Sequence, residues 1–190
     1  LLTGERLVLN CLQRMSAVAT KTRKFQDLLE GLPTKVLDTR KTTPGLRLLE
    51  KYSVQVGGGM NHRFGLYDMV MLKDNHLDFA GGIAPAIEKT KNYLAAKGKH
   101  LKIEVEARDL NEVREILAVG GIDRIMLDNF NYADTREAVS LIAGRCETES
   151  SGGIKEETIR EYAECGVDFI SVGALTHSVY NLDMSLKAVE

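Results

Sequence analysis

Short apolar segments with strand character alternate with helical segments along most of this chain, and each apolar segment ends in charged residues or glycines. Successive examples are VLDTRK from residue 36, MVMLKDN from 69, IEVE from 103, IMLDN from 125, SSGG from 150 and ISVG from 170. Alternation of this kind predicts a parallel sheet with right-handed crossovers. The carboxyl ends of parallel strands share one side of the sheet, where ligands bind in α/β proteins. We therefore expect these polar residues, far apart in the sequence, to meet in one site.

The number and patterning of the expected strands, about six, favour an α/β barrel over an open doubly wound sheet. Side chains alternate along a strand, so Glu104 and Glu106 share one face while Ile103 and Val105 share the other. The same alternation groups side chains in two further strands: Met69, Met71 and Lys73 in one, Met126 and Asp128 in the other. One face is aliphatic and suited to packing under helices, whereas the other becomes polar toward the strand exit, as at a barrel mouth.

Helical spacing of apolar residues predicts a long helical segment over residues 4–29, as one kinked helix or two helices, with Thr3 as N-cap. Gly31 and Pro33 end it. Later helices are expected over 85–97, 110–119, 132–143 and 155–165, with a last one beginning near Ser178. Asp109 is the expected N-cap of the helix over 110–119.

Composition excludes several classes of protein. The 190 residues are 44% hydrophobic and 27% charged, which is typical of one globular domain. A formal net charge of −2 gives no electrostatic basis for binding nucleic acid or an anionic membrane. The three cysteines lack C-x-x-C spacing, so a disulfide framework or zinc site is not expected, and a reducing cytoplasm is. No apolar run has the length of a membrane span.

Five basic residues follow the first expected strands: Arg40, Lys41, His62, Arg63 and Lys73. Arginine matches a carboxylate or phosphate in bidentate fashion, whereas lysine acts as a point charge. Side chains of this kind that converge would repel one another unless a polyanion lay among them. Each of them taken alone is equally consistent with an ordinary surface cation.

Three carboxylates, those of Glu104, Glu106 and Asp128, belong to the same expected barrel mouth. Carboxylates in this position bind Mg²⁺, accept hydrogen bonds from ribose hydroxyls or stabilise a developing positive charge. Structural salt bridges to the cations are the alternative interpretation.

Two glycine-containing loops, SSGGIK from residue 150 and VGALTHS from residue 172, each precede an expected helix. Backbone N–H groups in such loops bind phosphate, and barrel phosphate sites often use the last two strand–helix loops. A simple turn is the alternative for either loop. His100 and His177 are interpreted as solvated or capping residues, and Asn75 and Asn129 as residues that brace their loops.

The polar segments, read in order, resemble the successive signatures of the quinolinate phosphoribosyltransferase family, also called nicotinate-nucleotide pyrophosphorylase (carboxylating). The segments that carry the resemblance are DTRKTTPGLR from residue 38, GGGMNHR from 57, LKDNH from 72, EVE from 104, LDNF from 127, SSGGI from 150 and VGALTHS from 172. The resemblance covers essentially the whole chain.

The resemblance implies an N-terminal α/β sandwich domain followed by an open, TIM-like α/β barrel of about seven strands. This chain resembles the barrel, with residues 1–30 as a helical connection from the preceding domain and 31–190 as the barrel. The N-terminal domain is then largely absent. The chain does not begin with methionine, which agrees with a fragment or a processed form. The family also implies a homodimer, or a higher assembly of dimers, in which a neighbouring subunit completes each site.

The reaction that the resemblance implies is phosphoribosyl transfer from phosphoribosyl pyrophosphate to quinolinate, giving nicotinate mononucleotide, pyrophosphate and CO₂ in de novo NAD biosynthesis, in the cytoplasm. The implied quinolinate-binding residues are Arg40, His62, Arg63 and Lys73, with Arg6 supplied by the neighbouring subunit. The implied phosphoribosyl pyrophosphate-binding residues are Thr39, Lys41, Glu106, Asp128, Ser151, Gly152, Gly153, Val172, Gly173 and Ala174. Lys41, Glu106 and Asp128 are the implied catalytic residues, and Glu106 and Asp128 face Mg²⁺. If the expected register of this strand is shifted, Glu104 rather than Glu106 is the functional glutamate.

Three alternatives remain at the level of the sequence. A related phosphoribosyltransferase could use nicotinate or another pyridine base, although the crowded cations favour a dicarboxylate. A truncated or non-catalytic relative could bind a phosphosugar only. A different barrel enzyme acting on phosphosugars would leave the cations of the early strands unexplained.

Overall fold

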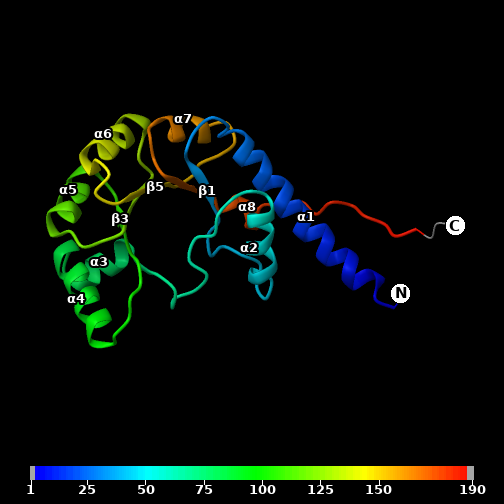
Figure 1. Ribbon diagram of the computed structural model, residues 1–190, viewed down its shortest axis with the longest axis horizontal. Coiled ribbons are helices and arrows are strands. Elements are labelled where there is room, and N and C mark those ends of the chain that lie inside the picture. The colour runs from blue at the N-terminus through cyan, green and yellow to red at the C-terminus, as the bar shows by residue number, and fades with distance from the viewer. Residues whose placement is uncertain (1–2, 188–190) are drawn as a thin grey trace.

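The structure, a computed structural model, describes residues 3–187 (Figure 1). Its strands are β1 (Lys35–Leu37), β2 (Val70–Leu72), β3 (Ile103–Ala107), β4 (Arg124–Asp128), β5 (Glu147–Ser151) and β6 (Phe169–Ser171). Its helices are α1 (Glu5–Asp27), α2 (Arg47–Val56), α3 (Asp74–Ala80), α4 (Ile83–Ala96), α5 (Leu110–Val119), α6 (Tyr132–Ile142), α7 (Ile159–Glu164) and α8 (Ala174–His177). No helix within residues 3–187 combines the length and apolar character needed to cross a membrane.

All strand pairs are parallel, and the six strands form one sheet in the order β1-β6-β5-β4-β3-β2. Strands β1 and β2 are the two edges. Between them runs the segment 57–69, which contacts the sheet through a single parallel bridge from Met60 to Leu37. The prediction of an α/β fold with an open barrel-like parallel sheet is confirmed, and the opening lies between β1 and β2.

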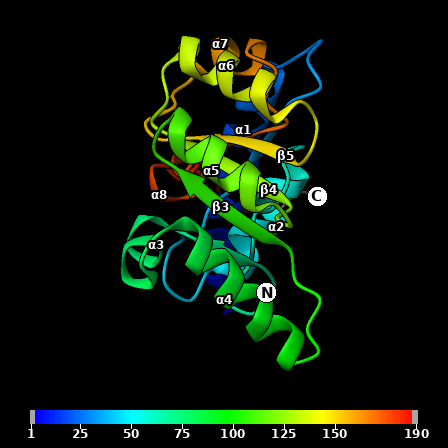
Figure 2. The same cartoon turned by 90° about the vertical axis from the view of Figure 1, so that its left-hand side faces the viewer.

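The outer face of the sheet carries the helices. Figures 1 and 2 show α3 to α7 following one another along this face, while α1 and α2 lie at the β1 end. The buried apolar core contains outward residues of the strands, such as Val105 and Ile125, together with helix residues such as Ile116 and Ile142. The odd residues of β3 are in this apolar core, as their alternation predicted, so the even residues Glu104 and Glu106 point to the interior of the barrel.

Helix boundaries agree with the sequence where local capping decides them. Asp109 caps α5, accepting hydrogen bonds from the N–H groups of Asn111 and Glu112 at 2.8 and 3.0 Å. Helix α4 begins at Ile83, with Pro85 still in the first turn, where an N–H has no intrahelical partner. Helix α1 is one helix rather than two, and its N-cap is Gly4, not Thr3.

The expected last helix near Ser178 is wrong. The last helix that the structure describes, α8, begins four residues earlier at Ala174, and residues 178–187 have no regular structure. The early start has a tertiary cause: Thr176 Oγ1 donates to the carbonyl of Lys41 at 2.9 Å, and Arg14 donates to the carbonyl of Thr176. Helix α7 is also shorter than expected, because Lys155 to Thr158 form a separate turn.

Candidate active site

A cavity of about 630 Å³ lies at the carboxyl ends of the strands. Six of the predicted residues line it from the first two strand exits and the segment between them: Thr39, Arg40, Lys41, His62, Arg63 and Lys73. Eight more line it from the remaining strand exits: Glu106, Asp128, Ser151, Gly152, Gly153, Val172, Gly173 and Ala174. The structure therefore brings the predicted site residues to one cavity, except Arg6 and the carboxylate Glu104, although Thr39 and Ala174 are 135 residues apart in the sequence.

Arg6 lies elsewhere. It is in the first turn of α1, its side chain is 68% exposed, and its guanidinium is 3.5 Å from Glu5. It does not line the cavity of its own chain.

Two cations of the cavity, Arg40 and Arg63, are near enough for their charges to interact. Arg63 is buried at 8% exposure, and its pKa is lowered, first by burial and then by the neighbouring charge of Arg40. Lys73, the N-cap residue of α3, places Nζ 3.4 Å from Glu106 Oε2. Two guanidinium groups that destabilise each other in a half-enclosed space favour the binding of an anion between them.

Glu106 and Asp128 face the cavity from the adjacent strands β3 and β4. The pKa of Glu106 is raised, mainly by burial and also by the negative charge of Asp128, while Lys73 opposes the shift. Asp128 Oδ2 accepts a hydrogen bond from Asn129 Nδ2 at 2.7 Å. Two mutually repelling carboxylates are hard oxygen ligands, and this donor set fits Mg²⁺.

The glycine loops line the cavity at the exits of β5 and β6. Gly152 has φ +97°, and a Cβ atom there would lie 2.2 Å from Asn129 Oδ1. Asn129 itself has φ +57°, and its N–H donates to the carbonyl of Ser151 at 2.9 Å, so it braces the loop as predicted. Gly173 precedes α8 directly, and a Cβ atom there would lie 3.0 Å from His177 Nε2 and 3.2 Å from Lys41 Cδ. Both loops thus offer backbone rather than side chains to the cavity.

Sequence reasoning missed several residues that line the cavity: Met71, Met126, Asn129, Ile154, Lys155, Ser171 and His177. The alternation that pairs Met71 with Lys73 and Met126 with Asp128 was a usable signal for the two methionines. His177, expected to be solvated or capping, lines the cavity because α8 begins at Ala174. His76, in contrast, only caps α3, accepting from the N–H of Lys73 at 3.0 Å.

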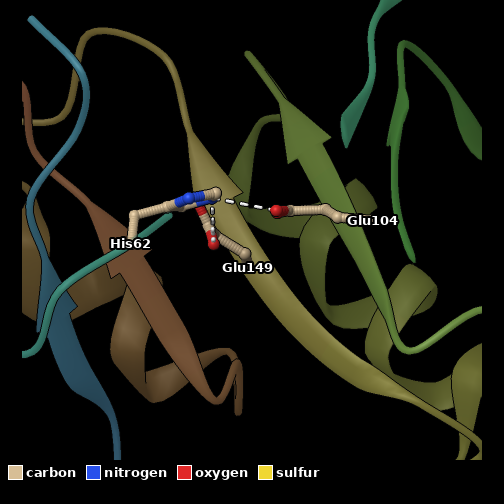
Figure 3. A group of neighbouring side chains, drawn as sticks. All are labelled: His62, Glu104 and Glu149. Carbon is tan, nitrogen blue, oxygen red and sulfur yellow. Dashed lines mark ion pairs between the residues drawn. The ribbon is translucent and has the colours of Figure 1, made fainter. Parts of the chain in front are cut away.

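A buried polar group lies deeper in the barrel, made of His62, Glu104 and Glu149 (Figure 3). His62 Nε2 is 2.9 Å from Glu104 Oε2 and 3.5 Å from Glu149 Oε2, although neither contact is aligned as a hydrogen bond. Arg124 donates to Glu149 Oε2 at 2.8 Å. Glu104 is fully buried, so Glu106 is the glutamate of β3 that reaches the cavity.

Burial determines the charge of this group. It raises the pKa of Glu104 and of Glu149 to about 7, and in Glu149 the charge of Glu104 adds to the effect. The pKa of His62 is lowered by burial, and its Nδ1 accepts from the N–H of Arg63 at 2.7 Å. A neutral imidazole with Nδ1 as acceptor carries its proton on Nε2, directed at the carboxyls. The lysines and arginines of the lining, rather than His62, therefore supply the positive charge of the cavity: Arg40, Lys41, Arg63, Lys73 and Lys155.

The donor atoms of His62, Glu104 and Glu149 lie within 4.8 Å of one another, a spacing that a metal ion could bridge. Arg124 already neutralises one of the two carboxylates. With both pKa values near 7, a single proton on the pair neutralises the other. The charge balance therefore favours a shared proton over a divalent cation.

The family model and the curated relatives that match this chain belong to the same family. Residues 18–187 match the model of the family described as quinolinate phosphoribosyl transferase, C-terminal domain. The chain is 47% identical to the chloroplastic nicotinate-nucleotide pyrophosphorylase [carboxylating] of Arabidopsis thaliana, over 98% of this chain and 57% of the relative. It is 48% identical to the probable nicotinate-nucleotide pyrophosphorylase [carboxylating] of Bacillus subtilis, over 98% of this chain and 63% of that protein.

Solved structures agree. NadC from Streptococcus pyogenes superposes with a TM-score of 0.91 and 45% identity, over 98% of this chain and 64% of that one. Nicotinate-nucleotide pyrophosphorylase from Francisella tularensis gives the same TM-score and identity, over 97% of this chain and 64% of that one. The chain thus spans about three fifths of the length of these relatives.

Proposed function

Because this chain belongs to the quinolinate phosphoribosyl transferase family, whose C-terminal domain it matches, we propose that it catalyses phosphoribosyl transfer to quinolinate with decarboxylation. The products are nicotinate mononucleotide, pyrophosphate and CO₂. One observation carries the proposal: a single cavity gathers five lysine and arginine side chains, two carboxylates and two backbone loops. These groups suit a dicarboxylate, a ribose and a phosphate.

In this proposal the pyridine dicarboxylate lies among Arg40, Arg63 and Lys73, beside His62. Two guanidinium groups and an ammonium match the two negative charges, and bidentate contacts orient the ring. The ring nitrogen then faces the anomeric carbon of the sugar, which is the alignment that the reaction requires.

Phosphoribosyl pyrophosphate lies along the part of the cavity that Thr39, Lys41 and the two glycine loops line. Thr39 and Lys41 bind its phosphates, and the loops Ser151–Gly153 and Val172–Ala174 bind the 5′-phosphate through backbone N–H groups. Glu106 and Asp128 bind the ribose and would hold Mg²⁺, which supplies positive charge for the departing pyrophosphate.

The reaction then follows from these positions. The ring nitrogen bonds to the anomeric carbon as the bond to pyrophosphate breaks, and pyrophosphate leaves with the electron pair. Glu106 and Asp128 stabilise the positive charge that develops on the ribose. The 2-carboxylate next leaves as CO₂, and the electron pair on the ring carbon is stabilised by the adjacent cationic nitrogen until a proton is added. Lys41, Glu106 and Asp128 are the proposed catalytic residues.

We also propose the assembly. A homodimer, or a larger assembly of dimers, would bring Arg6 of one subunit to the dicarboxylate site of the next. Residues 1–30 would connect to the preceding domain of the longer relatives, and 31–190 would form the barrel. A cytoplasmic location stays a prediction, since curated relatives include chloroplastic and mitochondrial proteins.

The decisive experiment is a turnover assay for nicotinate mononucleotide with quinolinate and, separately, with nicotinate. Arg63→Ala is expected to lose most quinolinate affinity in calorimetry, whereas Arg114→Ala, at the exposed ion pair with Glu137, retains it. Turnover with nicotinate alone would favour a different pyridine base. Binding of phosphoribosyl pyrophosphate without any turnover would favour a non-catalytic relative. Unchanged quinolinate affinity in Arg63→Ala would contradict the proposed site.

A further inference from the structure

The segment 57–69 carries His62 and Arg63 into the cavity but is not a strand of the sheet. Its backbone joins the sheet only around Met60, whose N–H donates to the carbonyl of Val36 at 2.8 Å and whose carbonyl accepts from the N–H of Asp38 at 3.2 Å. After Met60, the rest of this segment makes no backbone hydrogen bond to the sheet among the residues that the structure describes. Side chains must therefore fix the position of His62 and Arg63.

An ion pair between Asp38 and Lys51 supplies this connection. Both side chains are almost completely buried, at 0% and 1% exposure. Lys51 Nζ contacts Asp38 Oδ1 and donates to the carbonyl of His62 at 2.9 Å, while the N–H of His62 donates to Asp38 Oδ1 at 2.9 Å. The pair thus binds both backbone polar groups of His62.

Asn61 adds to the same arrangement. With its amide oriented so that Nδ2 is the donor, it donates to Asp38 Oδ2 and to the carbonyl of Lys51, each at 2.9 Å. Arg63 is tied in turn to His62, because its N–H donates to His62 Nδ1. Asp38 immediately precedes Thr39 and Arg40. One buried pair therefore connects the exit of β1, helix α2 and the segment that carries Arg63.

The environment of the pair argues against a role in stability alone. Burial raises the pKa of Asp38 to about 6, although Lys51 opposes the shift, and burial lowers the pKa of Lys51. A buried ion pair costs desolvation that its attraction only partly offsets, and apolar replacements are often as stable. What an apolar pair could not supply are the two hydrogen bonds that hold the backbone of His62.

We propose that Asp38 and Lys51 are positioning residues for the dicarboxylate site, and that they set Arg63 relative to Arg40. This inference rests on the proposed function. Lys41 has a separate anchor, since its carbonyl accepts from Thr176 Oγ1 and its N–H donates to Thr39 Oγ1 at 3.0 Å. The phosphate-binding side of the cavity is therefore expected to be unaffected when the pair is removed.

The test compares two affinities in the same variants. Lys51→Met, Asp38→Asn and the double variant are titrated with phthalate, an unreactive dicarboxylate, and with phosphoribosyl pyrophosphate. The dissociation constant for phthalate is expected to rise tenfold or more, while that for phosphoribosyl pyrophosphate stays within about threefold. Asp168→Asn is the control, because it removes the charge of a side chain that accepts from the Thr148 N–H away from the cavity.

The outcomes separate the two proposals. Folded variants that bind phthalate as tightly as the unmodified chain would overturn the positioning role. An equal loss of both affinities would overturn it too, since that is the result of a merely structural pair. If Lys51→Met fails to fold because Asp38 is left unpaired, the double variant leaves no isolated buried charge and carries the test. An unmodified chain that binds no phthalate would instead contradict the proposed function.

Discussion

At the scale of single residues, Glu104 and Glu149 are the carboxyls whose ionisation depends most on folding. Their pKa is about 7 in the folded chain against an ordinary 4.5. Below pH 4.5 both the folded and unfolded states hold these protons, so the stability they contribute is fully present. Between pH 4.5 and 7 only the unfolded state releases them, and the free energy of unfolding falls as pH rises.

Glu104→Gln is expected to remove this pH dependence, because glutamine resembles the protonated carboxyl and cannot ionise. Because the pair shares one proton, the raised pKa corresponds to a contribution on the order of 3 kcal/mol for the pair as a whole, which is lost between pH 4.5 and 7. The variant is therefore expected to be more stable than the unmodified chain at pH 8 and similar at pH 5. Urea unfolding at several pH values measures the free energy of unfolding of both proteins. If that free energy changes with pH in the same way in the two proteins, Glu104 does not share the buried proton.

Gly152→Ala tests the close approach of the loop to Asn129. A Cβ atom at 2.2 Å from Asn129 Oδ1, in a residue with φ +97°, requires the backbone to move. We expect a loss of roughly 1–3 kcal/mol of stability together with weaker binding of phosphoribosyl pyrophosphate. Gly144→Ala is the control, since Gly144 has φ +72° but open space around it, and it should lose only about 1 kcal/mol and no affinity. Equal effects at the two glycines would show that the contact is unimportant.

At the scale of elements, Arg14 of α1 joins three other parts of the barrel. Its guanidinium pairs with the fully buried Glu50 of α2 at 2.7 Å and donates to the carbonyls of Thr176 and Val179 and to Thr43 Oγ1. The N–H of Thr43 donates to the other oxygen of Glu50 at 3.0 Å. Helix α1 is therefore part of the same packed unit as α2 and α8.

Arg14→Met is expected to destabilise the chain by about 3–5 kcal/mol, because it leaves Glu50 buried without a charged partner. The double variant Arg14→Met with Glu50→Gln should recover a large part of that loss. Thermal and urea unfolding provide the measurement, with Arg160→Met, which removes an exposed ion pair to Glu164, as control. If Glu50→Gln lowers the stability of the Arg14→Met variant further, the unpaired charge of Glu50 is not the cause of the loss.

Local signals explain which elements could be predicted. Asp109 defines the start of α5 through hydrogen bonds to its own neighbours, and the strand exits were visible as changes from apolar to charged residues. The start of α8 depends on Thr176 and Arg14, which are distant in sequence, and no local pattern reveals it. The same limit hid His177, which lines the cavity because α8 begins at Ala174, and Glu149, which meets His62 and Glu104 only in the folded barrel.

At the scale of the whole molecule, the outer surface of α1 near Arg6 is apolar. Leu7 is 73% exposed, Val8 56% and Leu12 45%. This surface is consistent with the proposed contact between subunits that would carry Arg6 into a second site.

Mixing two inactive variants tests that arrangement. Arg6→Ala and Arg63→Ala are each expected to lose quinolinate turnover in the homodimer. Random exchange of subunits would produce mixed dimers in half of the molecules, each with one intact site of two, and restore about a quarter of the activity. Analytical ultracentrifugation measures whether the chain forms the proposed dimer. No recovery, with exchange demonstrated, would mean that Arg6 does not act across the interface.

The opening between β1 and β2 has a consequence for engineering of the chain. Because segment 57–69 bears no ladder hydrogen bonds beyond Met60, randomising Phe64 to Tyr67 would leave the sheet pairing intact. None of these four residues lines the cavity, so the turn can be varied in sequence or length without rebuilding the barrel.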